Sequence, residues 1–152
     1  MKYYNKGDLE AISIAEFSEE LKSNPAINYT DSLITSADSD FVLDTADVFR
    51  QGVCQLFARA LQDKFGYSVY KIEVGKSFHI FCKSEDKLTY IDVRGKTTDF
   101  HEFIAGSDLP AISCDVSKPY QFETDDFDGD YYEIGLAFAK AIITRDEKRY
   151  QI

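Results

Sequence analysis

The sequence is poor in cysteine, proline and positive charge, and it contains no tryptophan. Its three cysteines are an odd number, which argues against a disulfide framework and for a reducing compartment, the cytoplasm. The 17 Lys and Arg against 27 Asp and Glu give a net charge of −10. Such a charge opposes binding to nucleic acid or to an anionic membrane, because their phosphate groups would be repelled. No apolar run approaches the roughly 18 residues of a membrane span, and the first residues, Met1 to Asn5, lack an apolar signal segment.

The length and the aromatic content indicate an ordinary globular domain. A chain of 152 residues has the length of one domain, and we expect residues 1–152 to form a single one. Ten Tyr and 12 Phe provide the material for a sizeable core. The acidic balance suits a protein whose partner, if it has one, is a basic protein.

A helix is predicted to begin at Cys54. The apolar residues that follow it recur at helical spacing and form one stripe with it: Phe57, Ala58, Leu61 and Phe65. Gly66 is a normal stop signal for such a helix. Because a helix N-terminus carries unpaired N–H groups and a partial positive charge, this position favours a thiolate on Cys54.

Three strand-like runs follow at 68–74, 77–83 and 88–94. A turn centred between Glu85 and Asp86 would place His79 directly opposite Asp92, on one face of an antiparallel pair. In that register Phe81 lies opposite Tyr90, and the other face carries Phe78, Ile80, Cys82, Ile91 and Val93. We therefore expect an α+β fold, with an antiparallel sheet of three or more strands packed against the Cys54 helix.

Cys54, His79 and Asp92 together have the types and the order of a cysteine nucleophile with its base and an orienting carboxylate. The backbone N–H of Gln55, directly after the cysteine, is a candidate oxyanion donor.

Residues 51–95 resemble the core of the transglutaminase-like and papain-like cysteine enzyme superfamily, in which a Cys heads a helix packed on an antiparallel sheet. Gly52 before the Cys, Phe57-Ala58 after it and the Asp-x-x-Gly at Asp92 to Gly95 also fit. In papain-like enzymes a Gln upstream of the Cys donates to the oxyanion, so the resemblance makes Gln51, three residues before Cys54, a second oxyanion candidate, although its spacing differs from that pattern and a solvent-exposed side chain is the alternative. The family's usual Trp after the His is missing, and the 25-residue gap from Cys to His is short, so the substrate class is left open. The resemblance implies amide hydrolysis, deamidation or transglutamination of a protein or peptide substrate, without a metal or cofactor.

The sequence also leaves open alternatives to a catalytic triad. His101 is the other histidine and the rival base, although its acidic neighbours suggest an exposed helix face. Asp92 can simply pair with Arg94, and Cys54, His79 and Cys82 can be compared with a zinc site, which lacks a close Cys pair. If the triad is vestigial, the protein is an acidic binding module of the inhibitor or immunity type, covering a basic surface.

The remaining segments are predicted more coarsely. A capping box from Ser13 to Glu16 starts a helix inside 9–22. Thr98 is expected to cap a helix ending at 103, Cys114 to be buried in a strand at 111–116, and Asp130 to cap a final helix at 131–145. A loop is expected at 27–40 and a short helix at 41–50.

Overall fold

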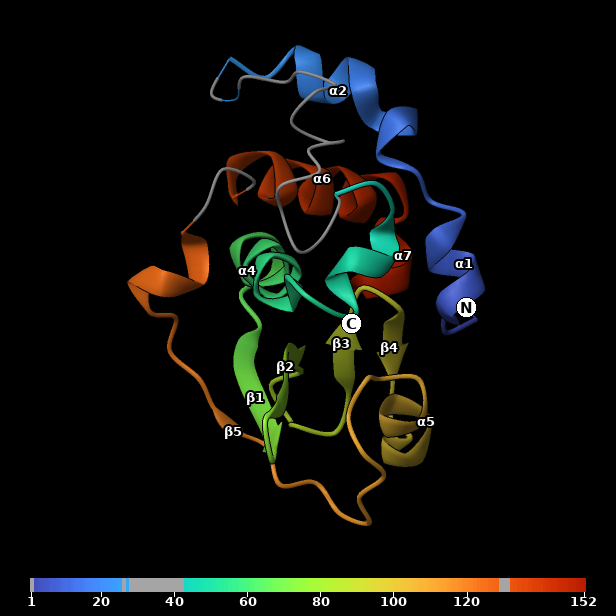
Figure 1. The fold of residues 1–152 in the computed structure, drawn as a ribbon. Coiled ribbons are helices and arrows are strands. Elements are labelled where there is room, and N and C mark those ends of the chain that lie inside the picture. The colour runs from blue at the N-terminus through green and yellow to red at the C-terminus, as the bar shows by residue number, and fades with distance from the viewer. Residues whose placement is uncertain (1, 26, 28–42, 129–131) are drawn as a thin grey trace.

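The computed structural model describes residues 2–25, 27, 43–128 and 132–152. Within these residues it contains one antiparallel sheet with the strand order β4-β3-β2-β1-β5 (Figure 1). The strands are β1 (Ser68–Val74), β2 (Ser77–Lys83), β3 (Tyr90–Asp92), β4 (Gly95–Thr97) and β5 (Lys118–Pro119). The helices are α1 (Lys6–Glu10), η1 (Ile14–Phe17), α2 (Ser18–Lys22), η2 (Ala46–Phe49), α4 (Cys54–Phe65), α5 (Phe100–Ala105), η3 (Thr124–Phe127), α6 (Tyr132–Arg145) and α7 (Glu147–Tyr150).

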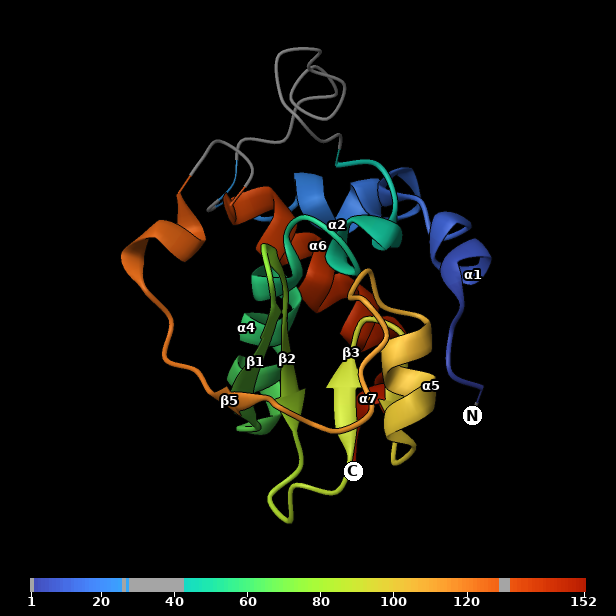
Figure 2. The same ribbon diagram turned by 60° about the horizontal axis from the view of Figure 1, so that its bottom comes forward.

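The predicted α+β fold is confirmed. Helix α4 lies between the sheet and α6, and α5 covers the opposite face of the sheet (Figures 1 and 2). Two apolar clusters result, a large one around α4 and a smaller one between the sheet and α5. None of the described helices is long and apolar enough to cross a membrane.

Helix α4 begins and ends where the sequence predicts. Its buried side chains are Cys54, Leu56, Phe57, Ala58, Ala60 and Leu61, which form the stripe that packs against β2 and α6. Gly66 caps the C-terminus with φ of 74°, a left-handed conformation that a glycine adopts without steric cost. Local periodicity and one glycine therefore define this helix.

The predicted register of β2 and β3 is wrong by two residues. Cys82 pairs with Ile91 and Lys83 with Tyr90, so His79 is not directly opposite Asp92. Residues 84–89 form a wide turn, closed by the bond from the Ser84 N–H to the Thr89 carbonyl at 3.1 Å. Because a displacement by an even number of residues preserves the faces, His79 and Asp92 stay on one side of the sheet. Ile80, Cys82, Ile91 and Val93 share the other face as predicted, and the structure shows that this face packs on α4.

The predicted strand at 88–94 is also too long. Only Tyr90–Asp92 is extended, and Val93 and Arg94 form the turn into β4. Strand β1 occupies the predicted residues, and Tyr70 and Ile72 share a buried face.

Several local predictions outside the sheet need correction. The predicted helix at 9–22 is divided into α1, η1 and α2, although Ser13 and Glu16 do form the capping box. Asp99 rather than Thr98 caps α5, because its carboxylate accepts from two N–H groups of the first turn. The described part of the predicted helix at 41–50 contains η2.

The segment at 111–116 is not a strand, and Cys114 is exposed rather than buried. The short strand β5 follows it instead and pairs with β1. The helix predicted at 131–145 as the last one is α6 (Tyr132–Arg145), and the short helix α7 follows it. All of the predicted loop at 27–40 except residue 27 lies outside the described residues, and so does the predicted cap Asp130.

Candidate active site

Asp92, at the end of β3, is the centre of a buried polar cluster. Its carboxylate accepts from the backbone N–H of Arg94 at 2.9 Å, and from the Arg94 guanidinium through Nε and Nη2, the latter at 2.6 Å from Oδ2. The Tyr3 hydroxyl donates to the same carboxylate at 3.2 Å. Burial alone would raise the pKa of Asp92, but the charge of Arg94 and the contact with His79 hold it well below its usual range. Asp92 is therefore an anion that four donors fix in place.

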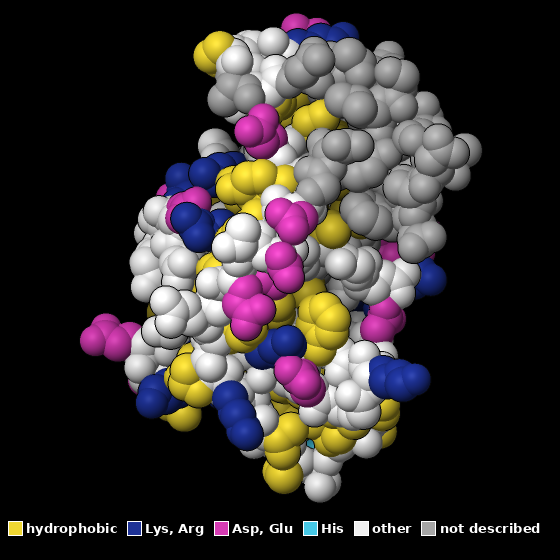
Figure 3. Space-filling model, turned by 60° about the vertical axis from the view of Figure 1, so that its left-hand side comes forward, with side chains coloured by type: hydrophobic (Ala, Val, Ile, Leu, Met, Phe, Trp, Pro, Cys, Tyr) yellow, Lys and Arg dark blue, Asp and Glu magenta, His cyan; other side chains and the backbone are white. Residues whose placement is uncertain are grey.

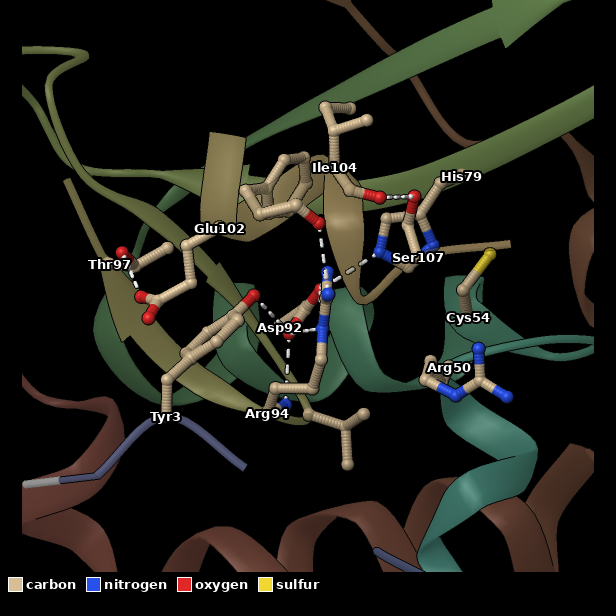
Figure 4. Close-up of polar contacts among 12 residues, drawn as sticks. Tyr3, Arg50, Cys54, His79, Asp92, Arg94, Thr97, Glu102, Ile104 and Ser107 are labelled. Carbon is tan, nitrogen blue, oxygen red and sulfur yellow. Dashed lines mark hydrogen bonds and ion pairs between the residues drawn. The ribbon is translucent and has the colours of Figure 1, made fainter. Parts of the chain in front are cut away.

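His79 lies next to this anion, on β2. Its Nε2 is 3.0 Å from Oδ2 of Asp92, and its ring packs beside the touching rings of Phe81 and Phe103, with a centroid distance of 5.8 Å to each. Burial favours the neutral ring, but hydrogen bonds to Asp92 and Cys54, with the charges of both groups, raise the pKa of His79 to about 9. Because Asp92 holds Nε2, Nδ1 is the ring nitrogen that faces the Cys54 sulfur (Figure 4).

Cys54 reaches this histidine from the other side, as the first residue of α4. Only Cys82 and Lys83 of β2 pair with β3. Further along β2, the Ile80 N–H has no partner on β3 and donates to the Cys54 sulfur, at 3.3 Å. The Cys54 sulfur therefore takes the place of a strand partner at this end of β2.

The charges in the cluster can balance in pairs. Arg94 and Asp92 form a neutral ion pair whose side chains are 1% and 3% exposed. A proton on His79 adds a positive charge to this buried site, and transfer of that proton from the Cys54 thiol leaves a thiolate beside it. The cluster can thus hold two charges of each sign without a net buried charge.

A cavity of about 240 Å³ opens at this cluster, and Cys54 and His79 line it. Gln51 also lines the cavity, but its carboxamide lies against the carboxylate of Asp108. The side chain of Gln55 points elsewhere and donates to the Asp126 carbonyl at 3.0 Å. The backbone N–H of Gln55 lies in the first turn of α4, where N–H groups have no partner within the helix.

Sequence reasoning missed several of these residues. From the sequence, Arg94 is only a structural partner of Asp92 and not a member of the site, although its position two residues after Asp92 indicates that the two side chains can pair. Tyr3 and Asp108 reach the site from distant parts of the chain, and no local pattern identifies them. Arg50 lies only four residues before Cys54, but no pattern in the sequence indicates that it lines the site.

The alternative ligands and bases lie elsewhere. His101 is exposed on α5. Cys82 faces α4, where its sulfur donates to the Ala58 carbonyl at 3.4 Å, and burial raises the pKa of its thiol. In the described part of the chain, no group of three His, Cys, Asp or Glu side chains could hold a metal ion.

Comparison of the chain with models of protein families, with curated proteins and with solved structures finds no match.

Proposed function

We propose that the protein is a cysteine-dependent acyl-transfer enzyme, acting by amide hydrolysis, deamidation or transglutamination. The observation that carries the proposal is the orientation of His79: Asp92 holds Nε2 at 3.0 Å, and Nδ1 faces the sulfur of Cys54 at the start of α4. This is the arrangement that a nucleophile, a base and an orienting carboxylate require.

The chemistry proceeds in two halves. His79 takes the proton of the Cys54 thiol, and the sulfur attacks the acyl carbon to form a tetrahedral intermediate. As the intermediate collapses, the bond to the leaving amine breaks, His79 returns the proton to that amine, and a thioester remains on Cys54. Water or a second amine then gives a proton to His79 and attacks the thioester, which regenerates the thiol.

The oxyanion of the intermediate needs donors at the start of α4. The backbone N–H of Gln55, with that of Cys54, supplies them in this proposal, and the partial positive charge of the helix N-terminus supports the same oxygen. Gln51 would join them only after leaving Asp108, so we assign the main role to Gln55.

The likeness to the transglutaminase-like and papain-like enzymes supports the same proposal. Cys54 heads a helix on an antiparallel sheet, and His79 and Asp92 come from neighbouring strands of it. The three cysteines are free thiols, which fits a reducing compartment, and we propose a cytoplasmic location with a protein or peptide substrate.

A second candidate is a non-catalytic acidic binding module. Cys54 and His79 are only 4% and 2% exposed, and Arg94 and Tyr3 satisfy Asp92 in a way that stabilises the fold without any reaction. Asp and Glu side chains run down one face of the molecule (Figure 3), and Glu123, Asp125 and Asp128 are exposed around η3. Such a face suits a basic protein partner.

Thiol reactivity separates the two candidates. Brief treatment of the native protein with limiting iodoacetamide near pH 6, followed by peptide mass spectrometry, should label Cys54 before the exposed Cys114, while Cys82 stays unlabelled. His79→Gln should slow the labelling of Cys54 at least tenfold, on the order of the effect of a paired base on thiolate content. His101→Gln is the matched control and should leave the rate unchanged.

Circular dichroism spectra of each variant confirm that it is folded. The acyl-transfer proposal fails if Cys54 labels no faster than Cys114, or if His79→Gln leaves its rate unchanged. The binding module then takes its place.

A further inference from the structure

The cavity at Cys54 has two cationic side chains in its lining, in a protein that is acidic as a whole. Two cationic side chains, Arg50 and Lys76, and one carboxylate, Asp108, line it. With Asp47, which also pairs with Arg50, the charges around the cavity balance, whereas the whole chain carries a net charge of −10. If Asp108 turns away, the lining becomes positive and attracts an anionic group to the site that holds the nucleophile.

Arg50 is fixed in the wall of this cavity. It is 7% exposed, and its Nε lies 2.7 Å from Oδ1 of Asp47, while its Nη2 lies 3.4 Å from Oδ2. Asp47 is itself buried, at 8% exposed. The two-point pair with a buried carboxylate holds the guanidinium plane, and Figure 4 shows this group on the same side of the site as the Cys54 sulfur.

The third contact of Arg50 is of a different kind. Its Nη1 donates to Oδ1 of Asp108 at 2.7 Å, and the Asp108 side chain is 46% exposed. An exposed carboxylate gains little from an ion pair and loses little on returning to water. Asp108 therefore occupies a position in the cavity that a ligand carboxylate can take from it, whereas Arg50 cannot leave Asp47.

We propose that this cavity binds a carboxylate of the acyl substrate, with Arg50 as the fixed donor, Lys76 as a second cation and Asp108 as the group displaced. The inference rests on the proposed function and adds the substrate class: peptides that carry an acidic side chain or a C-terminal carboxylate close to the reacting carbonyl. Arg50 and Lys76 are specificity-determining residues in this assignment, and Cys54 and His79 carry out the chemistry.

Two alkylating reagents that differ in charge test the proposal. Iodoacetate and iodoacetamide attack the same sulfur, so the ratio of their rates at Cys54, divided by the ratio at Cys54 in the urea-unfolded chain, measures preference for a carboxylate. We expect this preference to exceed one in the native protein. Lys76→Gln, on an exposed turn, should lower the preference for iodoacetate about twofold, as expected for an exposed ion pair. Asp108→Asn should raise this preference about fivefold, because a charge that repels the carboxylate is lost from a partly buried site.

A second measurement distinguishes the two sources of the carboxylate. Acetyl-aspartate amide offers a side-chain carboxylate, and acetyl-alanine offers a C-terminal one, and each is tested for protection of Cys54 against iodoacetamide. Protection by one of them identifies the source, and its loss in Arg50→Lys, which keeps the charge but not the planar group, assigns the contact. Protection by neither compound contradicts the proposal.

The outcomes separate this inference from the proposed function. A native preference of one, unchanged in Lys76→Gln and Asp108→Asn, overturns the carboxylate site even if Cys54 reacts quickly with iodoacetamide. A preference that responds to both variants supports the carboxylate site even if His79→Gln shows that the triad is inactive.

Discussion

Replacement of Arg94 by methionine removes the one permanent cation from the buried cluster and keeps a side chain of similar length. Asp92 then loses all three of its guanidinium contacts, among them the one of 2.6 Å between Nη2 and Oδ2. The Phe103 carbonyl also loses its donor, which is Nη1 of Arg94 at 2.9 Å. The anion that remains is 3% exposed, so water cannot replace these donors.

The expected cost follows from this burial. Removal of one partner of a buried ion pair costs about 3–5 kcal/mol, because an uncompensated charge stays in the interior. Asp92→Asn should cost a similar amount, since it leaves the guanidinium unpaired. The double variant Arg94→Met with Asp92→Asn removes both charges, so its loss should be well below the sum of the two single losses.

Urea unfolding at pH 7, followed by circular dichroism, measures these free energies. With a slope of about 2 kcal/mol per molar urea, each single variant should lower the midpoint by about 2 M. Lys64→Met is the control: it removes an exposed ion pair of 3.7 Å to Glu147 and should cost less than about 1 kcal/mol. Losses below about 1 kcal/mol in Arg94→Met, or additive losses in the double variant, would refute the account of a coupled buried pair.

Three further predictions concern titration, close packing and the core. NMR should show the ring of His79 titrating near pH 9, and in Asp92→Asn at lower pH, because the protonated ring loses its anion; a ring that titrates at the same pH in both proteins would show that Asp92 does not stabilise the imidazolium. Gly106→Ala should destabilise the fold and slow Cys54 labelling, since the new Cβ would lie 2.7 Å from Nη1 of Arg94; unchanged urea midpoint and labelling would contradict that contact. Phe138→Ala removes a fully buried ring and should lower the free energy of unfolding in urea by about 3–5 kcal/mol; a loss below about 1 kcal/mol would mean that neighbouring side chains fill the space of the missing ring.

The α4 helix and its cysteine could be predicted because their signals are local. The apolar stripe from Cys54 onward repeats with a period of 3.6 residues, and Gly66 after it is a helix stop signal; both are visible within a few residues of sequence. The faces of β2 were predicted for the same reason, since alternation determines which side chains share a side. The register was not, because it depends on the turn at 84–89, whose conformation no residue type there specifies.

The residues of the site also fall into those that local sequence predicts and those that it does not. The sequence by itself determined that Cys54 begins a helix and that His79 and Asp92 share one face of a sheet, because hydrophobic periodicity acts over a few residues. Only the tertiary structure decided that Tyr3 donates to Asp92, that the Ile80 N–H donates to the Cys54 sulfur, and that Arg50 and Asp108 line the cavity. These partners are brought together by the burial of two apolar clusters on opposite faces of the sheet, which is a property of the whole chain.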